Sequence, residues 1–219
     1  WYVVDSEPGS YLYCGLSRDA SKEEILERIN NNTITDILNK IEVKAGDVVM
    51  VKAGTIHAIG AGVFICEIQQ NSNCTYRMYD YDRRDKFGNP RELHVKKALD
   101  VVDNHKYIKD NKTEVVIARN EHFTEERLVQ CKYFEVYKYD VNDEAKITVD
   151  EASFVSVLFI NGSGTIETDD YEKTMEFKAG DSFFVSAGLR SIIIKGQATM
   201  VVTCLLYTSP SPRDAHESR

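Results

Sequence analysis

The sequence predicts an all-β protein built from two similar barrels or sandwiches with short helical insertions. Most segments are short runs rich in Val, Ile, Tyr and Phe that end at Gly, Pro or Asp, which is typical of strands. An internal repeat divides the chain into two copies of one strand–turn–strand unit. The 219 residues leave room for two domains of about 100 residues each.

The composition indicates a soluble globular protein, with 42% hydrophobic and 28% charged residues. No apolar run approaches the roughly 20 residues that span a bilayer, so we expect no membrane partner. The net charge of −8 disfavours a nucleic-acid partner, because phosphate neutralisation needs a basic face. Five scattered cysteines without a CxxC motif indicate reduced thiols in a cytoplasmic protein: Cys14, Cys66, Cys74, Cys131 and Cys204.

The first half alternates expected strands with two expected helices. Ser21 and Glu24 match a capping box, and Ile25, Leu26 and Ile29 follow at helical spacing. A second helix is expected from about Glu92 to Asp103. The expected strands are 1–5, 10–15, 41–44, 47–52 and 62–70.

A polar connector at 105–112 is expected to separate a first domain, 1–104, from a second, 113–204. The expected strands of the second domain are 113–119, 131–140, 154–160, 164–167, 182–186, 190–195 and 198–203. Residues 158–167 are interpreted as a strand and a glycine turn.

Both ends of the sequence are unusual. Trp1 opens what looks like a strand already under way, so we expect further residues upstream. Residues 205–219 resemble a translated sequencing adapter and are expected to be a non-native, disordered tail. The alternative is a natural disordered tail.

The repeat pairs residues 41–47 with 175–181, so that Lys44 and Lys178 stand 134 residues apart. Each copy contains Lys-Ala-Gly-Asp, then four apolar-rich residues and a second Ala-Gly. The glycines suit positive φ at tight turns, and the aspartate can accept hydrogen bonds from turn amides. At the same offset, His57 corresponds to Ser191. A framework residue tends to be shared by both copies, so the difference favours a ligand role for His57.

His57 is the candidate metal ligand, at the start of an expected strand. Imidazole suits zinc or iron. The alternative is a strand histidine satisfied by a backbone carbonyl. Catalytic zinc needs three protein ligands. No other histidine is well placed, whether His94, His105, His122 or His216. Either His57 is not a ligand, or its partners precede Trp1.

A polar stretch after residue 66 is the second candidate site. Glu67 lies on one face of an expected strand, and a polar run leads to Arg77. From 77 to 97 there are seven Lys or Arg against four Asp or Glu. Such a basic segment suits an anionic substrate such as a sugar phosphate, because arginine binds phosphate through two hydrogen bonds. For Arg83 and Arg84 we favour the alternative, a surface Asp–Arg ladder.

Three segments resemble type I mannose-6-phosphate isomerase in its short bacterial, two-cupin form: 53–60, 67–72 and 75–83. The resemblance extends from Trp1 to about Thr203. It implies two cupin barrels of the double-stranded β-helix or jelly-roll type. The first would be an incomplete part of the catalytic zinc domain, and the second a metal-free cupin domain.

The resemblance also implies a function. The family consists of zinc-dependent aldose–ketose isomerases that interconvert mannose 6-phosphate and fructose 6-phosphate through an enediol or enediolate. It implies one zinc per intact chain, with His57 as the last ligand histidine and the others upstream of Trp1. Arg77 and Glu67 are then expected to be catalytic and substrate-binding, and Ser72 substrate-binding. Asn73 replaces an aspartate common in the family.

Because those ligands are absent, this chain alone is expected to be inactive. It is also expected to be a monomer. One alternative is a non-catalytic cupin protein that binds sugar phosphates or has a regulatory role. Another is an iron-dependent cupin oxygenase, whose substrates would not require the basic segment.

Overall fold

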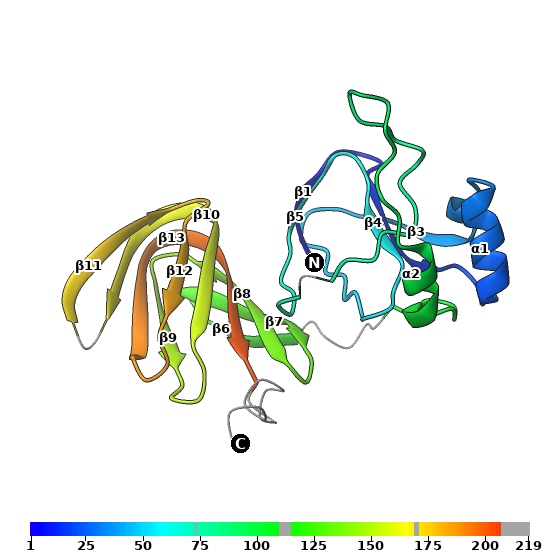
Figure 1. Ribbon diagram of the computed structural model, residues 1–219. Helices are drawn as coiled ribbons and strands as arrows, with labels where there is room; N and C mark the ends of the chain where they lie inside the picture. Colours follow the sequence, from blue (N-terminus) through cyan, green and yellow to red (C-terminus); the bar gives the residue numbers. More distant parts are fainter. Residues whose placement is uncertain (73, 110–114, 169–170, 207–219) are drawn as a thin grey trace, which may run out of the picture. The chain divides into compact units, whose positions relative to one another are not determined.

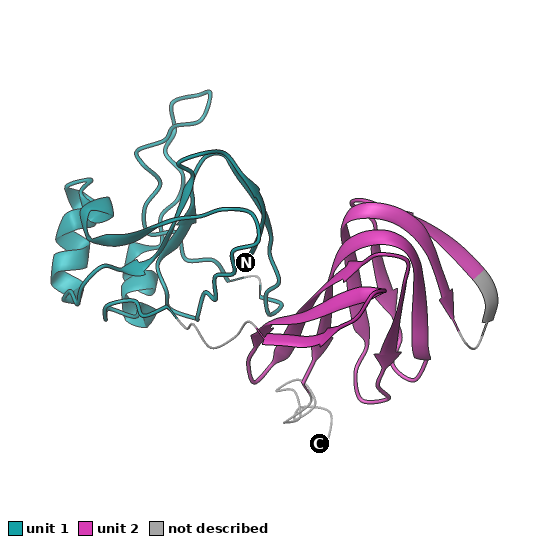
Figure 2. Ribbon diagram, turned by 180° about the vertical axis from the view of Figure 1, so that it is seen from behind, with its two compact units in different colours: residues 1–110 teal, residues 111–219 magenta. Residues whose placement is uncertain are grey.

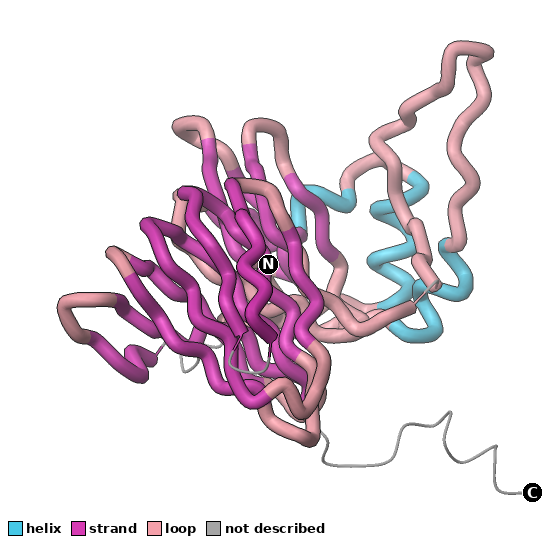
Figure 3. Tube along the Cα trace, turned by 90° about the vertical axis from the view of Figure 1, so that its left-hand side faces the viewer, coloured by secondary structure: helices cyan, strands magenta, loops and turns pink. Residues whose placement is uncertain are grey.

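The computed structural model describes residues 1–72, 74–109, 115–168 and 171–206. The chain divides into two compact units, 1–110 and 111–219 (Figure 2). Unit 2 is built from strands, whereas unit 1 combines short strands, the helices and irregular segments (Figures 1 and 3). The prediction of a mostly β protein is therefore confirmed.

Unit 1 contains two small antiparallel sheets. The first pairs β1 with β5, and the second has the strand order β3-β2-β4. Buried side chains between them form one core: Val3, Leu12, Cys14, Val43 and Val49. The elements are β1 (Tyr2–Ser6), β2 (Tyr11–Leu16), α1 (Lys22–Asn30), the 3₁₀ helix η1 (Ile34–Ile37), β3 (Leu38–Glu42), β4 (His57–Ile59), β5 (Val63–Cys66) and α2 (Val95–Val101).

The helices of unit 1 share a second core. Ile25 and Ile29 of α1 pack with Ala98 of α2, and Leu16 of β2 joins them. The predicted N-cap is confirmed, since Ser21 Oγ accepts the backbone N–H of Glu24 at 3.1 Å. The carboxylate of Glu24 instead pairs with Arg18 and Arg28, and these hydrogen bonds lower its pKa to about 2.

Unit 2 contains one eight-stranded sheet with the main order β11-β10-β13-β8-β7-β6. In addition, β12 pairs with β10 and β9 pairs with β13. The strands are β6 (Val115–Arg119), β7 (Phe123–Gln130), β8 (Phe134–Val141), β9 (Glu144–Val149), β10 (Val155–Thr168), β11 (Tyr171–Lys178), β12 (Ser182–Val185) and β13 (Arg190–Leu205).

Glycines let the two long strands of unit 2 bend together. Gly164 of β10 lies opposite Gly196 of β13. A Cβ on Gly164 would lie 1.9 Å from the carbonyl oxygen of Lys195, and Gly196 has φ +119°. Around these glycines each strand changes its outer partner, β10 from β12 to β11 and β13 from β9 to β8. The strands on both sides of the change contribute to one core that includes Phe159 and Ile194. The expected glycine turn is thus a bend within a continuous strand.

The repeat corresponds to one turn that occurs in both units. In unit 1, Asp47 Oδ2 accepts the N–H of Lys44 at 2.9 Å, and Gly46 has φ +92°. Gly46 N–H donates to the carbonyl of Val3 at 2.8 Å, and Val3 N–H returns a hydrogen bond to Asp47.

The second copy repeats this pattern. Asp181 Oδ2 accepts the N–H of Lys178 at 2.9 Å, and Gly180 has φ +89°. Gly180 N–H donates to the carbonyl of Phe159 at 2.8 Å, and Phe159 N–H returns a hydrogen bond to Asp181. Each turn is therefore held to a strand of its own unit by equivalent bonds.

Several predicted boundaries are wrong. Residues 47–52 form no strand, and the strand predicted at 41–44 is instead β3. The second helix covers only Val95–Val101, because His94 is its N-cap. β7, β9 and β11 were not predicted, and each of β10 and β13 joins two predicted strands.

The predicted tail begins too early, since Leu205 belongs to β13 and donates its N–H to Ser153 Oγ at 2.9 Å. Residues 207–219 lie outside the described part of the chain. The five cysteines are free thiols. Among the described residues, no helix is long and apolar enough to cross a membrane.

Candidate functional site

His57 is the first residue of β4 and lies opposite Cys14 of β2. Its side chain is exposed, and Nδ1 lies 2.7 Å from the carbonyl oxygen of Thr55. A carbonyl can only accept, so Nδ1 carries the proton and Nε2 keeps a free lone pair. This arrangement suits a metal ligand, and it equally fits a strand histidine bonded to a carbonyl.

Trp1 brings His57 and Glu67 together. The imidazole lies edge-on to the indole ring, with 5.3 Å between the ring centroids. Indole Nε1 donates to Glu67 Oε1 at 3.0 Å. The β1–β5 register explains this contact, because Tyr2 pairs with Cys66 and the next pair outward is Trp1 with Glu67. An imidazole and a carboxylate therefore flank one aromatic ring at the edge of the first core.

The cysteines beneath this group are poor metal ligands. Burial raises the pKa of the Cys14 thiol, and also that of Cys66. A thiol binds metal as the thiolate, so burial works against metal binding by both.

Arg77 lies in the irregular segment between β5 and α2 and is half-buried. Its backbone is joined to His94 by two hydrogen bonds. Within the described residues, its guanidinium makes no hydrogen bond or ion pair. A half-buried guanidinium without a partner is free to bind an anion.

Ser72 is exposed, and its Oγ accepts the N–H of Cys74 at 3.1 Å. Residue 73, where the sequence has asparagine, lies outside the described residues. Among the described residues, no hydrogen bond, ion pair or ring contact joins Ser72 or Arg77 to the Trp1 group. The described structure therefore brings together only two of the four predicted site residues, His57 and Glu67.

Other basic side chains of this segment have local partners. Arg84 pairs with Asp82 at 3.3 Å, as the ladder interpretation requires. Arg83 lies over the Tyr81 ring, 5.2 Å from its centroid. Arg91 Nη1 lies 3.6 Å from Asp80 Oδ1. Arg77 therefore differs from these neighbours in having an uncommitted guanidinium.

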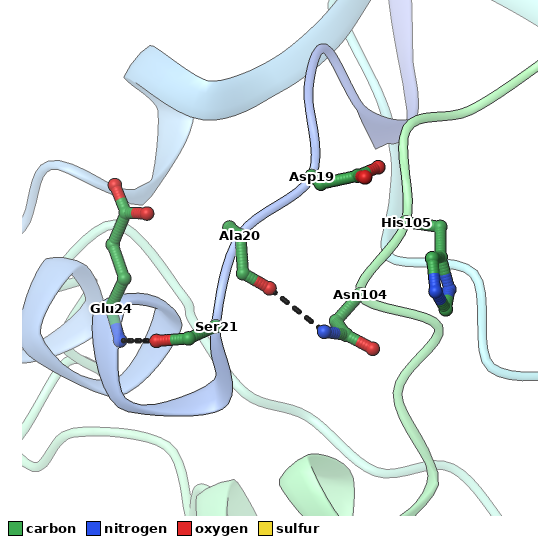
Figure 4. A pocket seen from close by; sticks show the side chains of 6 residues that line it. All are labelled: Asp19, Ala20, Ser21, Glu24, Asn104 and His105. Carbon is green, nitrogen blue, oxygen red and sulfur yellow. Dashed lines mark hydrogen bonds between the residues drawn. The ribbon is translucent and has the colours of Figure 1, made fainter.

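A hollow of about 410 Å³ lies elsewhere in unit 1 (Figure 4). It is lined by Asp19, Ala20, Ser21, Glu24, Asn104 and His105. Its polar groups are largely used within the chain: Asn104 Nδ2 donates to the carbonyl of Ala20 at 2.9 Å, and Asp19 accepts the N–H of Lys106. None of the predicted site residues lines it.

A complete zinc site is not formed by the described residues. In those ranges, no three His, Cys, Asp or Glu side chains are grouped so that they could hold a metal ion. His57 supplies one ligand of the required kind, whereas catalytic zinc needs three. The residues present therefore do not by themselves fit a zinc centre, and no catalytic step is assigned to one.

Sequence reasoning missed the parts played by Trp1 and His94. A strand pattern does not reveal the register that places Trp1 beside Glu67. His94 is 17 residues from Arg77, and their contact depends on how the intervening loop closes.

Comparison with known proteins shows what this chain is similar to. Residues 124–205 match the family described as mannose-6-phosphate isomerase, cupin domain. Over 93% of its length, the chain is 36% identical to the crystal structure of mannose 6-phosphate isomerase from Bacillus subtilis, with a TM-score of 0.83. The chain is therefore similar to mannose-6-phosphate isomerases, and residues 124–205 are similar to their cupin domain.

Curated relatives show the same similarity. The chain is 32% identical over 215 residues to mannose-6-phosphate isomerase ManA of Bacillus subtilis (strain 168), covering 94% of this chain and 63% of ManA. It is 39% identical over 208 residues to YvyI of the same organism, covering 93% of this chain and 62% of YvyI. The chain thus spans less than two thirds of these relatives.

Proposed function

We propose that this chain contributes to an aldose–ketose isomerase that interconverts mannose 6-phosphate and fructose 6-phosphate through an enediol or enediolate. The observation that carries the proposal is the likeness to the Bacillus subtilis isomerase over nearly the whole chain. We propose two cupin barrels as its architecture, in keeping with the turn shared by the two units.

In this proposal Arg77 binds the sugar phosphate or stabilises negative charge that develops on the reacting oxygens. Its free guanidinium supports either role. Glu67 moves the proton between the two carbons. Trp1 orients this carboxylate through the 3.0 Å bond to Oε1, which leaves Oε2 available.

Ser72 is proposed as a further substrate contact, and His57 as a metal ligand through Nε2. The zinc ion is inferred from the family alone. Held by His57 together with further ligands, such an ion would supply Lewis-acid chemistry.

A non-catalytic chain that binds sugar phosphates is the second candidate. It is favoured by the finding that the described residues form no metal-binding group. Under both functions Arg77 binds an anionic sugar, but only the first predicts turnover.

Calorimetric titration of the chain with fructose 6-phosphate, fructose and inorganic phosphate tests binding. A coupled assay for mannose 6-phosphate, with and without added Zn²⁺, tests catalysis. We expect fructose 6-phosphate to bind more tightly than fructose. Equal binding of the two sugars, or none, would refute both functions, whereas turnover of mannose 6-phosphate would refute the second.

A further inference from the structure

His94 is the residue that holds the backbone at Arg77. We propose that His94 is a positioning residue that fixes Arg77 and makes its placement depend on pH. This inference rests on the proposed function of Arg77 and extends it to the regulation of the same site.

The two residues are joined by a reciprocal pair of hydrogen bonds. The backbone N–H of His94 donates to the carbonyl oxygen of Arg77 at 2.6 Å, and the N–H of Arg77 donates to imidazole Nδ1 at 3.3 Å. The pair fixes the peptide groups on both sides of Arg77, and with them the direction in which its side chain leaves the backbone.

His94 is itself anchored in the core. It is the N-cap of α2, and its carbonyl accepts the N–H of Ala98, a residue that is 5% exposed, at 2.9 Å. An N-cap side chain commonly accepts a hydrogen bond from the first turn of its own helix. His94 makes no such bond. Its imidazole serves Arg77 instead, so α2 provides a rigid support for that residue.

The Nδ1 bond exists only while Nδ1 is unprotonated. The neutral ring then carries its proton on Nε2, which lies 3.9 Å from Glu92 Oε1. Besides Glu92, whose side chain is 85% exposed, the groups recorded around the ring are Tyr76, with 6.3 Å between centroids, and Arg77. Protonation would set an N–H against the N–H of Arg77. The anchor is therefore present while the ring is neutral and is lost when Nδ1 is protonated.

Amide exchange of Arg77 in the ¹⁵N-labelled 219-residue chain tests the bond directly. After correction for intrinsic rates, we expect exchange to be about fivefold faster at pH 5.5 than at pH 7.5, the equivalent of one ordinary hydrogen bond. His94→Asn keeps an acceptor near the Nδ1 position but cannot titrate, so its Arg77 amide should be equally protected at both pH values. In His94→Gln the side-chain acceptor lies one bond farther from the backbone than Nδ1, so the Arg77 amide should lose its protection at both pH values.

The same variants connect the anchor to ligand binding. Sugar phosphates also titrate near pH 6, so wild type is compared with His94→Asn at each pH. At pH 5.5 we expect wild type to bind fructose 6-phosphate about fivefold more weakly than His94→Asn, and at pH 7.5 equally well. His105→Asn, an exposed histidine in the same unit, should behave as wild type.

Two results would overturn the inference: Arg77 exchange independent of pH in the wild type, or protection retained in His94→Gln. Failure of the proposed function gives a different result. If the Arg77 amide tracks His94 but fructose 6-phosphate does not bind, the coupling stands and the function is refuted.

Discussion

Nδ1 of His57 lies 2.7 Å from the carbonyl oxygen of Thr55, two residues earlier in the chain. The bond fixes the ring and presents Nε2 as an acceptor, which prepares one metal ligand but not a metal site. The next ligand-type side chain in this group, Glu67, is engaged by Trp1.

We therefore expect the 219-residue chain to hold no tightly bound zinc, because one imidazole leaves most coordination positions to water. Metal analysis after dialysis against buffered Zn²⁺ should give the same low content for wild type and His57→Ala. One zinc per wild-type chain that survives dialysis and is lost in the variant would contradict this expectation.

Replacement of Arg77 should weaken sugar-phosphate binding selectively. Loss of charge-assisted hydrogen bonds costs about 1.5–3 kcal/mol, so Arg77→Ala should raise the Kd for fructose 6-phosphate by about 10- to 100-fold. Arg77→Lys should recover part of this loss, because a point charge still attracts the dianion.

The matched control is Arg84→Ala, since Arg84 is already paired with Asp82. In an active enzyme, a role in the transition state would lower kcat by about 10²–10³. A role in holding phosphate would raise KM instead. Equal Kd values for Arg77→Ala and Arg84→Ala would remove Arg77 from the site.

The repeated aspartates should stabilise their own units to a similar extent. Asp47→Ala and Asp181→Ala each remove a 2.9 Å hydrogen bond to a turn N–H, and each should cost about 1 kcal/mol of unfolding free energy. Trp1 is the single tryptophan of the chain, so its fluorescence in a urea titration should report the change in unit 1.

For unit 2, amide exchange in β10 and β13 provides the corresponding measurement. Lys44→Ala and Lys178→Ala serve as controls because these residues contribute only a backbone N–H to the turn bonds. A large loss of unfolding free energy in one unit with none in the other would show that the two turns are not equivalent.

An exposed ion pair should make unit 2 sensitive to pH. His122 Nδ1 lies 2.9 Å from Asp143 Oδ1. The hydrogen bond to Asp143 raises the pKa of His122 above 6.5, and that to His122 lowers the pKa of Asp143 below 3.8. The histidine contribution is complete below pH 6.5 and disappears as pH rises through the raised value. The aspartate contribution is complete above pH 3.8 and disappears as pH falls through the lowered value.

The pair should therefore stabilise unit 2 most between pH 3.8 and 6.5. A double-mutant cycle with His122→Ala and Asp143→Asn should show favourable coupling at pH 5.5 that shrinks by pH 8.5. Coupling that grows with pH would have the wrong sign and would refute the assignment.

Gly164→Ala should destabilise unit 2 strongly, by about 3 kcal/mol, because the new Cβ would lie 1.9 Å from a backbone oxygen of β13. Gly180→Ala is the comparison, since a Cβ there meets nothing within 4 Å and only the positive φ opposes it. Amide exchange in β13 distinguishes the two. If Gly164→Ala destabilised unit 2 less than Gly180→Ala, the two strands would have to separate easily at the bend.

The sequence signals that succeeded are local. The hydroxyl of Ser21 and the Gly–Asp turns act within a few residues, so their partners could be read from spacing alone. β7 and β9 were missed because charged residues, such as Glu125, Glu126 and Arg127, interrupt their apolar pattern. Pairing with β8 and β13 stabilises these segments, and that contribution is invisible in the segment itself.

The site could be predicted only as a set of residue types. Resemblance to a family indicated Glu67, Ser72 and Arg77, but the contacts that orient Glu67 and Arg77 come from distant residues. Trp1 reaches Glu67 across 66 positions and His94 reaches Arg77 across 17. Such contacts depend on strand register and loop closure, which spacing in one sequence does not determine.

The position of β13 in the sheet has a consequence for biosynthesis. This strand pairs with β8, β9 and β10, so the centre of the unit 2 sheet leaves the ribosome after all three of its partners. Unit 1 consists of residues that emerge earlier and have their own cores. Unit 1 should therefore fold during translation before unit 2 is complete. At that stage β8, β9 and β10 have unpaired edges, because β13 has not yet been synthesised. During that interval the nascent chain is most exposed to aggregation, and chaperones that bind unpaired strands would protect it.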